Sequence, residues 1–71
     1  MKIEIIFDRE HGRRNRGWFA RTTDAQGQEE DCQLDTLWSK DARVPESTIR
    51  AWAATYYDVD GADILIFGGA R

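Results

Sequence analysis

The sequence predicts an α+β fold, a small and mostly antiparallel sheet of three to four strands with one amphipathic helix packed on one face. Three observations support this prediction: alternating apolar residues at 2–10, an apolar stripe with helical spacing at 45–57, and a short apolar run at 62–67. Alternation with a period of two is typical of a half-buried strand, whereas repeats of three and four residues are typical of an amphipathic helix. The expected order is β-β-(β)-α-β, without a repeat or a linker, so we expect residues 1–71 to form a single domain.

The first two strands are expected to form an antiparallel hairpin. In residues 2–10, Ile3, Ile5 and Phe7 alternate with polar side chains, and β-branched residues favour a pleated strand. A second β-rich run begins at Gly17, after a segment longer than the two-residue turn that hairpins favour. The two faces of this second run carry Trp18, Ala20 and Thr22 on one side and Phe19, Arg21 and Thr23 on the other.

Residues 29–43 follow two competing patterns. Cys32 and Leu34 alternate weakly with polar neighbours, but Leu34 and Trp38 also stand at helical spacing. We predict a short edge strand over 29–34, followed by an irregular or single-turn helical segment that ends at Arg43. Cys32 is the only cysteine, which excludes an internal disulfide, and we expect it to be a partly buried small apolar residue.

The segment 45–57 gives the clearest helical pattern, because Pro45 suits a first helical turn and apolar residues recur at three and four positions. We expect this stripe to pack on the sheet face that carries Ile3, Ile5 and Phe7. The stripe consists of Ile49, Trp52, Ala53 and Tyr56.

The helix is expected to end at the turn 58–61. There the aspartate side chains satisfy free backbone groups. The following run, 62–67, is apolar enough to predict a strand buried on both faces and central to the sheet.

Charge is unevenly distributed along the chain, whose net charge is −3. Residues 1–23 hold six basic and three acidic side chains, whereas residues 24–71 hold four basic and ten acidic ones. An arginine-rich loop between the first two strands is either a contact for phosphates or for an acidic protein surface, or a solvated hairpin tip. Its basic residues, with those at the strand ends, are Arg9, Arg13, Arg14, Arg16 and Arg21.

The opposite pole is an acidic ridge of five acids within residues 24–35, a stretch that contains no basic residue. On a strand edge these acids resemble the spacing of phosphates and suit a basic nucleic-acid channel of another protein. The alternative is that they discourage sheet-to-sheet aggregation. The ridge consists of Asp24, Glu29, Glu30, Asp31 and Asp35.

The stretch "SKDARVPESTIRAW", residues 39–52, resembles the turn and second helix of the helix-turn-helix DNA-binding family. Val44, Ile49 and Trp52 stand where that family places apolar core residues, and Ser39 stands where it places a small one. The turn glycine of the family is replaced by Arg43, and the chain as a whole is acidic. By this resemblance, the side chains facing the major groove would be Glu46, Ser47, Thr48 and Arg50.

We expect no enzymatic activity, cofactor or metal. The candidate nucleophile–base pair is Cys32 with His11, the single histidine, and no third group to position them is evident. The stretch "DVDGAD" at 58–63 departs from the register of an EF-hand calcium loop. The chain begins without a basic stretch and an apolar core, so we expect no secretory signal, no membrane contact and a cytoplasmic location.

These observations favour a small, non-catalytic protein–protein interaction module. We expect an inhibitor or regulator of the phage or mobile-element type, similar to anti-defence proteins, that covers a surface of a larger, nucleic-acid-handling host protein. The chain itself is expected to be a monomer or a weak homodimer. The alternatives are a DNA-binding regulator that uses residues 39–52 and, more remotely, RNA binding through the arginine-rich loop.

Overall fold

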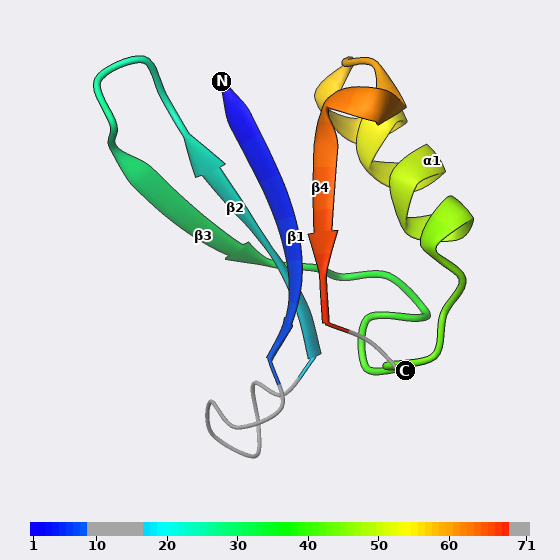
Figure 1. Cartoon of the computed structure of the whole chain (residues 1–71). Coiled ribbons are helices and arrows are strands. Elements are labelled where there is room, and N and C mark those ends of the chain that lie inside the picture. The colour runs from blue at the N-terminus through cyan, green and yellow to red at the C-terminus, as the bar shows by residue number, and fades with distance from the viewer. Residues whose placement is uncertain (9–16, 69–71) are drawn as a thin grey trace.

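The computed structural model describes residues 1–8 and 17–68, which form one sheet and one α-helix (Figure 1). The elements follow the order β-β-β-α-β that the sequence predicts, with a short 3₁₀ turn before the last strand. They are β1 (Lys2–Asp8), β2 (Gly17–Thr23), β3 (Glu29–Gln33), α1 (Glu46–Tyr57), η1 (Gly61–Asp63) and β4 (Ile64–Phe67).

The four strands lie in the order β3-β2-β1-β4. β2 is antiparallel to both β1 and β3, whereas β4 is parallel to β1. The connection from β3 to β4 carries α1, which packs on one face of the sheet close to β4 (Figure 1). The predicted α+β class and the mostly antiparallel sheet are therefore confirmed.

The covered face of the sheet is built from the alternating apolar residues of β1 and β2. In the hairpin, Ile5 lies opposite Ala20 and Phe7 lies opposite Trp18, so that these side chains share one face. The core is completed by two helix residues, one residue of β4 and Leu34, which follows β3, in agreement with the predicted docking of the helix. Its buried apolar members are Ile3, Ile5, Phe7, Trp18, Ala20, Leu34, Ile49, Ala53 and Ile64.

Trp18 also anchors the irregular segment between β3 and α1. Its indole nitrogen donates a hydrogen bond of 2.7 Å to the carbonyl oxygen of Asp41, and its backbone nitrogen donates one of 2.8 Å to the carbonyl of Ser39. Gly17 allows this close approach, because a Cβ at its position would lie 2.5 Å from the Ser39 carbonyl oxygen. The segment that follows β3 is thereby held against the covered face.

The turn between α1 and β4 is closed by polar side chains. Asp58 takes the left-handed conformation at the end of the helix, and the Asp60 carboxylate accepts a hydrogen bond from the backbone nitrogen of Ala62, as expected for aspartates in a tight turn. Arg50 donates from one guanidinium nitrogen to the carbonyls of Gly61 and Ile64. The side chain of a helix residue therefore fixes the start of β4.

Three sequence predictions are wrong in detail. The last strand lies at an edge and not at the centre, because in the described sheet it pairs with β1 alone, and Leu65 and Phe67 are exposed. Tyr56 is 65% exposed because it lies at the margin of the helical stripe and stacks on Trp52 instead of entering the core. Cys32 is exposed because α1 does not cover the outer strand β3.

Among residues 1–8 and 17–68, no helix has the length and apolar character needed to cross a membrane.

Candidate functional site

The acidic ridge lies along one edge of the sheet. Glu29, Glu30 and Asp31 belong to the edge strand β3, in which all five residues are exposed. Asp24 lies in the turn that leads into this strand, and Asp35 lies just after its end. Because no strand covers β3 on its outer side in the described sheet, these carboxylates are exposed along that edge of the sheet.

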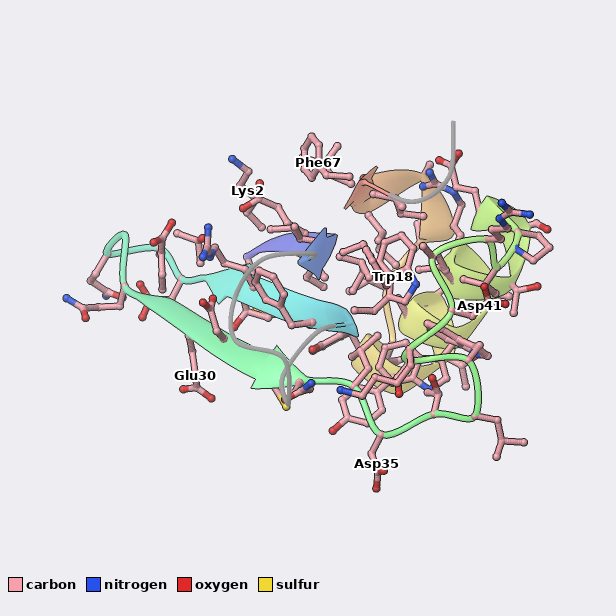
Figure 2. All side chains as sticks on the ribbon, turned by 90° about the horizontal axis from the view of Figure 1, so that it is seen from below. Lys2, Trp18, Glu30, Asp35, Asp41 and Phe67 are labelled. Carbon is pink, nitrogen blue, oxygen red and sulfur yellow. The ribbon has the colours of Figure 1, made fainter. Side chains whose placement is uncertain are left out.

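The ridge side chains divide between the two faces of the sheet. Glu30 lies opposite Thr22, which shares a face with the core residue Ala20, and Asp31 lies opposite Arg21 on the other face. Figure 2 shows Glu30 on the opposite side of the sheet from Phe67, which belongs to the uncovered face. The negative edge can therefore be approached from both sides.

The backbone of β3 also has an outward side. Hydrogen bonds from Leu34 to Trp18 and from Asp24 to Gln28 mark two of the closely bonded pairs of the β2–β3 ladder. Such pairs alternate along an antiparallel ladder, so the backbone groups of Glu29 and Asp31 point away from β2. An approaching partner therefore meets carboxylates and outward peptide groups on the same strand.

Asp31 is the member of the ridge that is bonded to a base. The Arg21 guanidinium donates two hydrogen bonds to its carboxylate, at 2.8 and 3.1 Å. This hydrogen bonding lowers the pKa of Asp31 below its usual value and raises that of Arg21. Arg21 also lies over the ring of Phe19, with 5.5 Å between the guanidinium carbon and the ring centroid. The guanidinium of Arg21 therefore contacts both Asp31 of β3 and the ring of Phe19 on the uncovered face.

On the helix-covered side, the ridge borders an aromatic cluster formed by Trp38, Trp52, Tyr56 and Tyr57. Trp52 lies at its centre, stacked on Tyr56 at 4.9 Å and edge-on to Trp38 at 5.8 Å between ring centroids. Burial raises the pKa of Tyr57, and the charges of Cys32, Tyr56 and Glu30 raise it further. Within the cluster, Tyr57 is the ring close enough to Cys32 and Glu30 of β3 for their charges to affect its pKa.

The sequence prediction assigned Trp52 and Tyr56 to the core and did not place this cluster beside the ridge. Adjacent tyrosines at 56 and 57 were a usable signal, because neighbouring residues of a helix point in directions about 100° apart. One buried face cannot accommodate both rings.

Of the residues that the helix-turn-helix resemblance places in a DNA groove, Arg50 and Glu46 have other contacts in this fold. Arg50 is bonded to two backbone carbonyls and, at 2.9 Å, to Glu46. The elements that precede α1 in the described residues are strands and turns, so the first helix of such a unit is missing there. Glu46, Ser47 and Thr48 are exposed on the first turn of α1.

Most of the basic loop, Arg9, Arg13, Arg14 and Arg16, lies outside the described residues. Arg21 is the exception, and it lies within β2, bonded to an acid of the opposite pole. Within the part of the chain that the structure describes, no group of three or more His, Cys, Asp or Glu side chains is arranged to hold a metal ion.

Comparison with known proteins adds no identity to this geometry: the chain matches no protein-family model, no curated protein and no solved structure.

Proposed function

We propose that this protein is a small, non-catalytic binding module that acts in the cytoplasm by covering a basic surface of a larger protein with its acidic β3 edge. In this role it is an inhibitor or regulator of the kind that phages and mobile elements encode. The partner we propose is a nucleic-acid-handling protein, because a channel that holds phosphates is lined by basic side chains that also attract carboxylates.

One observation carries the proposal: β3 is an exposed edge strand in which Glu29, Glu30 and Asp31 are consecutive. Burying like charges side by side is costly, so a strand with this sequence is suited to solvent or to a basic partner. Among the described residues, salt bridges involve Asp31 but neither Glu29 nor Glu30. Both glutamates are therefore available to basic groups of a partner.

The test is a charge reversal that leaves the internal Arg21–Asp31 bond intact. The double variant Glu29→Lys/Glu30→Lys changes only the two glutamates. A matched control, Ala51→Lys/Thr55→Lys/Asp63→Lys, makes the same net charge change at exposed positions away from β3. A third variant, Arg13→Glu/Arg14→Glu/Arg16→Glu, reverses the basic segment.

The protein that the wild type retains from a host lysate is identified by mass spectrometry, purified, and titrated with each variant. We expect the β3 variant to weaken binding at least about 30-fold, which is the loss typical of removing one partner from an interfacial charge pair. We expect the control to bind normally and the natural nucleic acid to compete with the wild type. Normal binding by the β3 variant, with loss in the arginine variant, would overturn the proposal in favour of the basic pole.

A further inference from the structure

The aromatic cluster beside β3 has the composition of a protein-binding surface. Trp and Tyr are enriched where partners contribute most binding energy, and here Tyr56 remains 65% exposed at the end of a helix. Leu37, next to Trp38 in the chain, is fully exposed. The cluster therefore offers apolar contact area on the helix-covered side of the sheet.

The stacking geometry makes Tyr56 the accessible ring of the cluster. One face of its ring stacks on Trp52, with 22° between the ring planes. Tyr57 approaches it edge-on, with 4.9 Å between centroids and 71° between planes. Trp52 is only partly exposed and supports the tyrosine from below. A partner thus meets a planar ring whose position is fixed by two aromatic neighbours.

The electrostatic surroundings of this ring favour a cation. Tyr56 and Tyr57 form the last turn of α1, where the helix dipole is negative, and no basic residue of that turn compensates it. Asp58 follows directly at the end of the helix and adds a further negative charge there. A phosphate would be repelled at this place, whereas an ammonium or guanidinium group would be attracted.

We propose that the Trp38–Trp52–Tyr56–Tyr57 cluster receives an arginine side chain of the partner protein, whose guanidinium stacks on Tyr56 at the negative end of α1. Arginine suits this surface better than lysine, because its planar group stacks on aromatic rings and bonds carboxylates through two nitrogens. The molecule already contains such an arrangement on its other face, where Arg21 lies over Phe19 and bonds Asp31. The inference rests on the proposed function and names the chemistry of the contact.

The test uses hexa-arginine as the probe, with hexalysine and a single-stranded oligonucleotide as comparisons. Binding is measured by NMR titration of the full chain. The variant Tyr56→Ala removes the ring, Tyr56→Phe keeps it, and Phe67→Ala removes an aromatic ring that is 45% exposed on the opposite face. Both positions are exposed, so each of the three variants is expected to fold.

We expect hexa-arginine to bind more tightly than hexalysine and to shift the signals of Tyr56, Tyr57 and the Trp52 indole. Tyr56→Ala should weaken it about 2- to 30-fold, the range of a cation–π contact, while Tyr56→Phe and Phe67→Ala bind as the wild type does. Equal binding by Tyr56→Ala and wild type, equal loss in Phe67→Ala, or tighter binding of the oligonucleotide would overturn the inference.

The double variant Glu29→Lys/Glu30→Lys separates the inference from the proposed function. If this variant loses the purified partner while Tyr56→Ala retains both the partner and hexa-arginine, the acidic edge acts without the aromatic cluster. The inference then fails and the proposed function stands. If the double variant keeps the partner, the proposed function itself fails.

Discussion

The two edge strands of the sheet, β3 and β4, occupy equivalent positions but are built from opposite chemistry. β4 is apolar, with Ile64 only 1% exposed, and a helix side chain fixes its start. β3 is acidic, and none of its five residues is buried. Of the two edge strands, α1 packs mainly against β4. β3 contributes no buried side chain, so packing does not determine its sequence.

The sharpest way to break this comparison is to truncate matched positions on the two edges. Ile64→Ala removes a buried side chain from β4 and should cost about 2–5 kcal/mol of unfolding free energy. Glu30→Ala removes a side chain of comparable length from an exposed position of β3 and should change it by less than about 0.5 kcal/mol. Urea denaturation of both variants measures the difference. Similar losses would mean that β3 contributes to the core after all.

A smaller effect is expected at the side chain that supports β4. Arg50→Ala removes the hydrogen bonds to the carbonyls of Gly61 and Ile64. Hydrogen bonds from charged groups contribute about 1.5–3 kcal/mol each, but this guanidinium is 34% exposed, and solvent reduces the loss. We expect a total loss of about 1–2 kcal/mol. A matched variant, Arg43→Ala, changes an exposed arginine and should leave the melting temperature unchanged.

An unchanged melting temperature in Arg50→Ala would show that η1 and β4 hold their places without the guanidinium. It would also leave the side chain available for the groove contacts that the helix-turn-helix resemblance implies.

The smallest effect concerns the ion pair that ties β3 to β2. Hydrogen bonding from Arg21 lowers the pKa of Asp31. A folded-state pKa below the unfolded one adds stability above about pH 4, the usual aspartate value. That stability is lost as the pH falls through the folded-state pKa. In an NMR titration, Arg21→Gln should return the Asp31 carboxyl toward its usual pKa. An identical titration curve in both proteins would exclude the bond in solution.

Sequence periodicity correctly predicted residues of β1 and α1 that face the core. The alternation of Ile3, Ile5 and Phe7 and the stripe through Ile49 and Ala53 correctly gave the covered face. The predicted central position of β4 was wrong, because an apolar run indicates burial but does not indicate how many strands lie beside it. Leu65 and Phe67 are apolar and nevertheless exposed.

The candidate surface was only partly predictable for a related reason. Consecutive acids at 29–31 excluded a buried strand, so their place at an edge followed from charge alone. The aromatic cluster depends on where α1 crosses the sheet and on the bond from Trp18 to Asp41, which joins residues 23 positions apart. No local pattern encodes that contact.

The central claim is that β3 binds the partner while β4 maintains the fold, and a binding footprint tests it most directly. The isotopically labelled chain is titrated with the purified partner, and NMR shift changes are mapped on the sequence. The account predicts the largest changes at Glu29 to Gln33, at Tyr56 and Tyr57, and at the indoles of Trp38 and Trp52. Changes concentrated on Ile6, Phe19, Leu65 and Phe67, with β3 unaffected, would contradict it.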